Sequence, residues 1–191
     1  SNNKDISIVI FDESVTLIAN GSFEGCRSLI QVIMPNNSFI ASIEDNAFNY
    51  CSSLTHISLP SSITSIGNSS FRNCTSLKEI LIPSSVTSIG DNSFRDCASL
   101  KKVSIPSSIT YIGQSVFSGC KSLVEVLIPS SITEIGSHAF RECSSLKKIT
   151  IPSSITKIGQ STFSGCISLL EIQIPTFLQS IDNHCFRECS S

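Results

Sequence analysis

Nine cysteines are the residues of this 191-residue chain whose number most invites metal or disulfide chemistry. Eight of them recur three residues after a phenylalanine, and only Cys185 lies outside that series. Cysteines that repeat in register should form one inward column. The Cβ atoms of parallel side chains one repeat apart lie farther from each other than the separation of about 3.8 Å that a disulfide needs. We therefore expect free, buried thiols. The regular series is Cys26, Cys51, Cys74, Cys97, Cys120, Cys143, Cys166 and Cys189.

Candidate metal ligands and catalytic groups do not converge. Cys185 and Cys189, with His184 beside them, offer only two soft ligands at an unusual separation, and no CxxC pair occurs. The other histidines, His56 and His138, lie at different positions of the repeat, and no GxSxG motif presents a nucleophile. Single glycines spaced by whole repeats do not form a phosphate-binding loop. The sequence predicts a noncatalytic protein without a metal or cofactor.

The elements that carry these residues form a repeat array. Phenylalanine occurs at positions 23, 48, 71, 94, 117, 140, 163 and 186, so that one interval of 25 residues is followed by intervals of 23. Each of the seven prolines follows a repeat cysteine by nine residues, which leaves none to mark a linker. The longer first interval contains residues 36–39 where other units have a Ser-Ser pair, an insertion that a surface turn can absorb. We interpret residues 1–191 as a single domain of about eight units.

One unit shows which side chains must point inward. Ile80 and Ile82 alternate with polar or outward residues, which predicts a short strand that Pro83 ends. Gly90 permits a turn, and Asp91 or Asn92 would cap a short helical turn that carries phenylalanine and cysteine inward. One unit cannot bury such a face alone, but stacked units bury columns of equivalent residues. One predicted column is Val32, Ile57, Ile80, Val103, Val126, Ile149 and Ile172.

The repeated pattern LxxIxIPxxIxxIGxxxFxxCxx, present from about Ile6 to Ser191, resembles the BspA-like leucine-rich repeats found in surface proteins of anaerobic bacteria and parasitic protists. The resemblance implies an α/β solenoid that is mostly β: a curved, right-handed array with a parallel sheet on its concave face and short helical or 3-10 turns. It also implies surface exposure and adhesion. Departures from the pattern put local turns in question: Asp12 replaces proline, Glu44 and Asp182 replace glycine, and residues 176–178 replace Ser-Ser-Ile.

Two outward columns are candidate binding surfaces. The first column contains His56, Glu79, Lys102, Glu125, Lys148 and Glu171. Because acidic and basic residues alternate, we expect neighbouring charges to pair and stabilise the sheet. The alternative is that the alternating charges bind a partner. The next column reads Ile33, Ser58, Leu81, Ser104, Leu127, Thr150 and Gln173. Leu81 and Leu127 have no core role. With Tyr111, Lys102 and Lys148 they form the predicted partner-binding patch. The alternative is that the two leucines are exposed without a function, as single apolar residues on protein surfaces often are.

A longer period overlies the basic one. Residues 101–123 resemble residues 147–169, 46 positions later, which indicates duplication in pairs of units. The same step relates His138 to His184, so their similarity reflects copying.

Charge and hydropathy exclude several partners. A net charge of −2, from 13 basic and 15 acidic side chains, does not provide the positive field of a nucleic-acid-binding protein. Apolar runs of a few residues are far short of the roughly 20 needed to cross a bilayer, so this segment is not expected to insert into membranes. Four glycosylation sequons, at Asn20, Asn36, Asn68 and Asn73, slightly favour secretion.

The predicted function is binding of a protein or glycoprotein ligand on the concave face. By resemblance, the chain is an adhesin-like repeat at the cell surface or outside the cell that binds host or extracellular-matrix proteins. The alternatives are a cytoplasmic interaction scaffold and, more remotely, the recruiting repeat of a larger enzyme. Because no polar cap is evident at either end, we interpret the chain as a segment of a longer array, with end-to-end self-association as a second interpretation.

Overall fold

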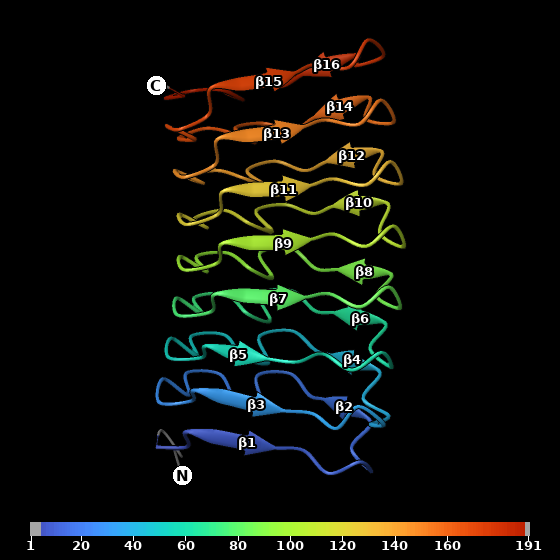
Figure 1. Cartoon of the computed structure of the whole chain (residues 1–191), viewed down its shortest axis with the longest axis vertical. Coiled ribbons are helices and arrows are strands. Elements are labelled where there is room, and N and C mark those ends of the chain that lie inside the picture. The colour runs from blue at the N-terminus through green and yellow to red at the C-terminus, as the bar shows by residue number, and fades with distance from the viewer. Residues whose placement is uncertain (1–4, 190–191) are drawn as a thin grey trace.

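The computed structural model describes residues 5–189, which form a stack of similar coils running from one end of the molecule to the other (Figure 1). Each coil contributes one strand to each of two parallel ladders. The first ladder contains β1 (Ile8–Ile10), β3 (Gln31–Ile33), β5 (His56–Ile57), β7 (Glu79–Leu81), β9 (Lys102–Ser104), β11 (Glu125–Leu127), β13 (Lys148–Thr150) and β15 (Glu171–Gln173). The second contains β2 (Leu17–Ile18), β4 (Ser42–Ile43), β6 (Ser65–Ile66), β8 (Ser88–Ile89), β10 (Tyr111–Ile112), β12 (Glu134–Ile135), β14 (Lys157–Ile158) and β16 (Ser180–Ile181).

Strand pairing follows the repeat register. Each residue pairs with the residue at the same position of the next unit, as Ile80 does with Val103 and Val126 with Ile149. The hydrogen-bonded orders are β1-β3-β5 and β7-β9-β11-β13-β15 in the first ladder, and β2-β4-β6-β8 and β10-β12-β14-β16 in the second. The expected solenoid with a parallel sheet is therefore confirmed at the level of strand order.

The predicted inward columns form the core. The inward residue of each strand in the first ladder is buried from β3 to β13, and the equivalent residues of the two end strands, Val9 in β1 and Ile172 in β15, are partly exposed. The repeat phenylalanines form a second column in which neighbouring rings lie nearly parallel with centroids 5.3 to 5.7 Å apart. Rings at this separation contribute an aromatic interaction in addition to the area they bury.

The expected helical turns are wrong. Between residues 5 and 189, no segment forms an α- or 3-10 helix, and the phenylalanine and cysteine lie in a layer of turns. Asn92 and Asp96, on either side of Phe94, have φ of 57° and 60°, in the left-handed region that interrupts a right-handed helix. Their amides, like that of Phe94, donate to carbonyls of the next coil. In the turn layer, amides that donate to the next coil thus alternate with amides that donate to the carbonyl three residues back, as Arg95 does to Asn92.

The repeat glycines have a different role from the one predicted. Gly90 does not have a positive φ; instead, a Cβ placed on it would lie 2.5 Å from the backbone nitrogen of Asn68 in the preceding coil. The coils therefore approach too closely at this point for a side chain. Glu44 and Asp182 occupy the same column in other coils, so stacking there accommodates a Cβ. Asp91, predicted as a helix cap, instead accepts a hydrogen bond from the Gln114 amide of the next coil at 2.7 Å.

The sequence departures retain the local turn. Val15 donates to the carbonyl of Asp12 at 3.2 Å, much as Val86 donates to the carbonyl of Pro83 at 3.1 Å. The Asp12 carboxylate also accepts a bond from the Ser14 amide at 2.9 Å, which replaces the constraint of a proline ring. Near the other end, Leu178 donates to the Pro175 carbonyl in the usual way.

Candidate functional site

The first ladder presents its alternate residues to solvent, and these define the sheet face of the molecule. In β7 and β11 the first and third residues are exposed while the middle residue is buried, as a pleated strand with one core side requires. Leu81 is 77% exposed and Leu127 is 65% exposed. Both are in register with Ser104, so the two leucines lie two coils apart with a small polar side chain between them.

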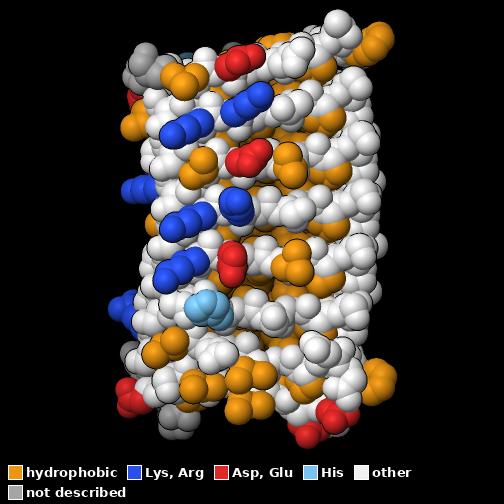
Figure 2. Space-filling view, in the orientation of Figure 1, with side chains coloured by type: hydrophobic (Ala, Val, Ile, Leu, Met, Phe, Trp, Pro, Cys, Tyr) orange, Lys and Arg blue, Asp and Glu red, His pale blue; other side chains and the backbone are white. Residues whose placement is uncertain are grey.

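Charged residues alternate along the sheet face as predicted, but they do not pair. Glu79 and Lys102 are in register, as are Glu125 and Lys148. Among the described residues, no lysine of this face lies within 4.0 Å of a carboxylate oxygen. Side chains that project in parallel keep the strand spacing of about 4.7–4.9 Å, which separates their charged groups. Figure 2 shows acidic and basic side chains alternating along one column of the face, with further basic side chains to the left of that column.

An open groove of about 830 Å³ follows the sheet face from β3 to β11. Leu81, Lys102 and Leu127 line it, together with Ile33 and Ser104. The lining is shared by several coils, and it combines aliphatic, hydroxyl and charged side chains. This shape suits an extended chain lying over several coils better than a small molecule, which binds in an enclosed apolar cavity.

The structure brings together three of the five residues predicted to bind a partner. Lys148 is not in the groove lining but lies on the same face, one strand beyond Glu125. Tyr111 begins β10 in the second ladder, where it pairs in register with Glu134, and it is separate from the groove. Burial raises the pKa of the Tyr111 hydroxyl, and nearby Asp91 and Glu134 raise it further. The binding role of the five residues remains a prediction.

Other exposed apolar side chains were not identified as binding residues. Ile10 is 72% exposed and pairs in register with Ile33, which extends the apolar column of the sheet face toward β1. Extending that column into the first unit would have found Ile10. Phe39 is also exposed, in the insertion that lengthens the first interval, where no repeat position predicts its environment.

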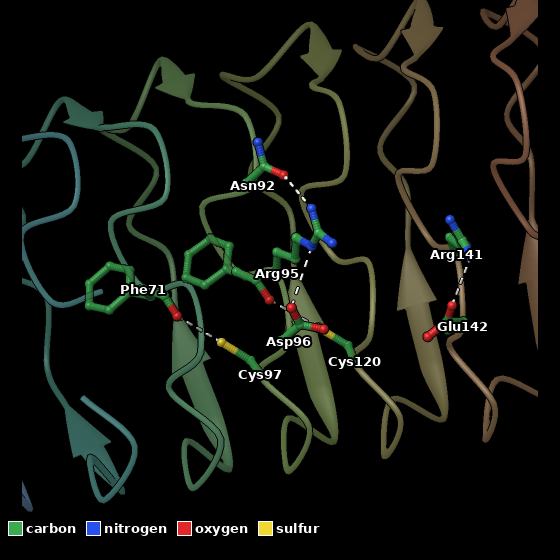
Figure 3. A network of polar contacts seen from close by, with 9 residues as sticks. Phe71, Asn92, Arg95, Asp96, Cys97, Cys120, Arg141 and Glu142 are labelled. Atoms are coloured by element: carbon green, nitrogen blue, oxygen red, sulfur yellow. Dashed lines mark hydrogen bonds and ion pairs between the residues drawn. The ribbon is translucent and has the colours of Figure 1, made fainter. Parts of the chain in front are cut away.

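The turn layer carries its own polar contacts (Figure 3). Arg95 lies 3.4 Å from the neighbouring Asp96, and Arg141 lies 3.1 Å from Glu142. These pairs are largely solvent-exposed, so each contributes little to stability. Partial burial lowers the pKa of His138, and the positive charges of Arg141 and Arg95 lower it further. His56 instead lies on β5, where its Nδ1 is 2.9 Å from the Thr55 hydroxyl.

The cysteines are free thiols with structural contacts. From Cys51 onward, each series cysteine places its Sγ 3.1 to 3.3 Å from the carbonyl oxygen of the phenylalanine in the preceding unit, as Cys97 does with Phe71 (Figure 3). Burial raises the pKa of Cys51 and Cys166 to about 12, so these thiols are neutral and unreactive at pH 7. Cys185 belongs to another inward column, equivalent to Ala139 and Thr162, and burial raises its pKa to about 11.

Residues 5–189 provide neither a metal-binding cluster nor a membrane-spanning helix. No group of three or more histidine, cysteine or acidic side chains lies in an arrangement that could hold a metal ion there. That part of the chain also has no helix with the length and apolar character needed to cross a bilayer.

The stacked parallel strands, the repeat period and the exposed sheet face define a solenoid of the leucine-rich-repeat class. The family model for the BspA type leucine-rich repeat region matches in six copies, over residues 1–124 and 87–191. The chain therefore belongs to the BspA type leucine-rich repeat family.

Solved structures of bacterial proteins share this architecture. A leucine-rich repeat protein from Bacteroides ovatus is 30% identical with a TM-score of 0.84, and the match covers 96% of this chain and 53% of that protein. The leucine-rich repeat protein of T. pallidum is 29% identical with a TM-score of 0.79, covering 86% and 78%. A leucine-rich cell surface protein from Faecalibacterium prausnitzii is 30% identical with a TM-score of 0.51, covering 88% and 59%. The chain spans about half the length of the B. ovatus protein. No curated protein matches the chain.

Proposed function

We propose that this chain is a noncatalytic protein-binding module whose sheet face is the partner surface. The observation that supports this most directly is the open groove, in which Leu81 and Leu127 project between polar side chains. Exposed aliphatic side chains on a broad, rigid face are typical of interaction surfaces. The groove residues are held by strands whose opposite side is buried, so the surface is preformed and binding requires little ordering.

We infer further that the module acts at the cell surface, in an adhesin-like role toward host or extracellular-matrix proteins. The family match and the F. prausnitzii relative, which is described as a cell surface protein, support this location. The alternative is a cytoplasmic scaffold that uses the same face, and it draws support from the free thiols.

Binding is tested with a panel of purified extracellular-matrix proteins in a surface-plasmon assay. The double variant Leu81→Ser and Leu127→Ser should fold normally, because Ser58 and Ser104 occupy the same column. We expect it to lose at least tenfold in affinity for a panel protein that binds the unchanged chain. Phe39→Ser, which removes an exposed aromatic side chain that does not line the groove, is the matched control. Equal affinity of the folded double variant and the unchanged chain would refute the assignment of the face.

Location is tested by protease treatment of intact source cells, with an antibody to the repeat and a cytosolic protein as internal control. Loss of the repeat while the cytosolic protein is spared supports the surface role. Protection of the repeat until lysis would favour the scaffold. Glycan occupancy at Asn20, whose side chain is exposed, would also argue against a cytoplasmic location. Glycan occupancy at Asn68 is a poorer test of location because the Asn68 side chain is already hydrogen-bonded. Its Nδ2 donates to the Asp45 carboxylate, and its Oδ1 accepts from the backbone amide of Asp91.

A further inference from the structure

The basic residues of the sheet face form a distinct feature, which we name the lysine margin. Its members are Lys78, Lys101, Lys102, Lys147 and Lys148, at the start of strands β7, β9 and β13. All five are exposed. Figure 2 shows basic side chains gathered on this side of the face.

The lysine margin is not neutralised by the chain itself. The described ion pairs involve Arg95, Arg141, Arg187 and Lys157, and none involves a lysine of the margin. The two outward columns at the start of these strands contain five lysines and three glutamates, so they carry a net charge of +2 in a chain whose net charge is −2. This face therefore attracts negatively charged groups while the rest of the molecule does not.

An aliphatic row runs beside the lysine margin. Leu81 and Leu127 are two residues along their strands from Glu79 and Glu125, which is about 6.6–6.8 Å at the usual strand rise. The leucines are two coils apart, and so are the Lys101–Lys102 and Lys147–Lys148 pairs. At the usual strand spacing, both distances are about 9.4–9.8 Å. The face thus repeats a lysine pair and a leucine with the same period, and the two series are offset from each other by one coil, because the leucines lie on β7 and β11 and the lysine pairs at β9 and β13.

A polypeptide can match both rows, whereas an anionic polysaccharide lacks aliphatic side chains for the leucines. In a polyproline II segment, residues three apart lie on the same side and are about 9.3 Å apart. Such a segment lying across the strands would place one side chain of every three on the leucine row and another on the lysine margin. We propose, on the basis of the protein-binding function above, that the sheet face binds an extended acidic segment with an aliphatic residue at every third position.

The probe is a fluorescent twelve-residue peptide of four Leu-Pro-Asp repeats, titrated with the whole chain and followed by anisotropy. Replacing aspartate by asparagine, or leucine by serine, gives two control peptides of the same length. We expect the first peptide to bind, each control peptide to bind at least tenfold more weakly, and the affinity to fall as salt rises. A heparin oligosaccharide is the third control.

Protein variants test the two rows separately. Lys101→Gln with Lys147→Gln, and Leu81→Ser with Leu127→Ser, should each weaken the acidic peptide at least tenfold. Lys157→Gln with Arg187→Gln removes the same charge from the second ladder and the turn layer and should change affinity less than twofold. Circular dichroism and melting temperature verify that each variant is folded.

Three results would overturn the inference: no binding of the acidic peptide at 1 mM, equal binding of the asparagine peptide, or tight heparin binding that Leu81→Ser with Leu127→Ser leaves unchanged. The last result would assign the face to a polysaccharide. If the peptide fails while the leucine variant still loses affinity for a matrix protein, the ligand class is wrong and the protein-binding function stands. If the leucine variant keeps its matrix-protein affinity, the assignment of the sheet face as the partner surface is wrong.

Discussion

Substituting alanine for Gly90 tests whether close stacking of coils, rather than turn conformation, requires the repeat glycine. A methyl group at Gly90 would lie 2.5 Å from the Asn68 backbone nitrogen and 2.7 Å from the Gly67 carbonyl carbon. Relieving both contacts requires a separation of about 1 Å between coils, since ordinary contact begins near 3.4 Å. Two hydrogen bonds of 2.8 Å cross this point, from the Gly90 amide to Ile66 and from the Asp91 amide to Asn68.

The expected cost follows from those bonds. Losing two hydrogen bonds costs about 1–3 kcal/mol. Alanine restricts the unfolded chain, which offsets about 0.4–1 kcal/mol. We expect Gly90→Ala to lower the free energy of unfolding by about 1.3 kcal/mol, or the melting temperature by about 3–5 °C for a chain of this size. Urea unfolding followed by far-ultraviolet circular dichroism measures both the midpoint and the slope.

Gly113 provides the matched control. A methyl group there would meet the Asp91 Oδ1 at 2.5 Å, but the next atoms are 3.4 and 3.7 Å away. Gly113→Ala should therefore cost only about 0.3 kcal/mol, because the Asp91 side chain can rotate and give up one hydrogen bond, and alanine offsets most of that loss by restricting the unfolded chain. In an Asp91→Ala background the same substitution should cost nothing. Asn68→Ala should not rescue Gly90→Ala, since backbone atoms remain in the way. Equal costs at Gly90 and Gly113, or rescue by Asn68→Ala, would refute the stacking explanation.

Three further outcomes are expected. Phe94→Ala removes one ring from the stack, and we expect a loss of about 3–5 kcal/mol in urea unfolding; a loss below 1 kcal/mol would show that the column collapses freely. The pKa of His138 is lowered on folding, so the unfolded state binds more protons and stability falls as the pH drops below about 6.5. His138→Asn should flatten the dependence of the melting temperature on pH between 5 and 7, and an unchanged slope would contradict this origin. In native protein, a thiol reagent at pH 7 should modify the half-buried Cys26 and Cys189 first, and rapid labelling of Cys97 without denaturant would contradict its burial.

The sequence predicted the strands and core because the repeat period alone determines which residues are stacked. Once Ile80 is taken as inward, its equivalents in every unit follow, and a pleated strand places Leu81 outward. The exposed column and its charges could therefore be predicted residue by residue. That Leu81, Lys102 and Leu127 line one groove followed from the same register.

The turn layer could not be predicted in the same way, because its geometry depends on bonds between coils. Asn92 and Asp96 tolerate a left-handed conformation, but Tyr50 and His138 adopt it as well without any sequence signal. Local propensity favoured a helix cap at Asp91, whereas the neighbouring coil provides the partner that its carboxylate bonds. Tyr111 was grouped with residues of the first ladder but lies in the second, and its distance from the groove depends on how the coil turns after Pro106.

The bonds between coils also restrict how such an array can change its length. Turn amides donate to the following coil, whereas the thiols and the Gly90 amide donate to the preceding one, so every interior coil is held from both sides by the same pattern. Adding or removing a whole coil restores that pattern at the junction, but a partial coil leaves donors and acceptors unmatched. The length of the array therefore changes by whole coils. Each added or removed coil changes the length of the sheet face that a bound segment can cover by one strand spacing of about 4.8 Å. The binding length of the sheet face can therefore change only by whole coils.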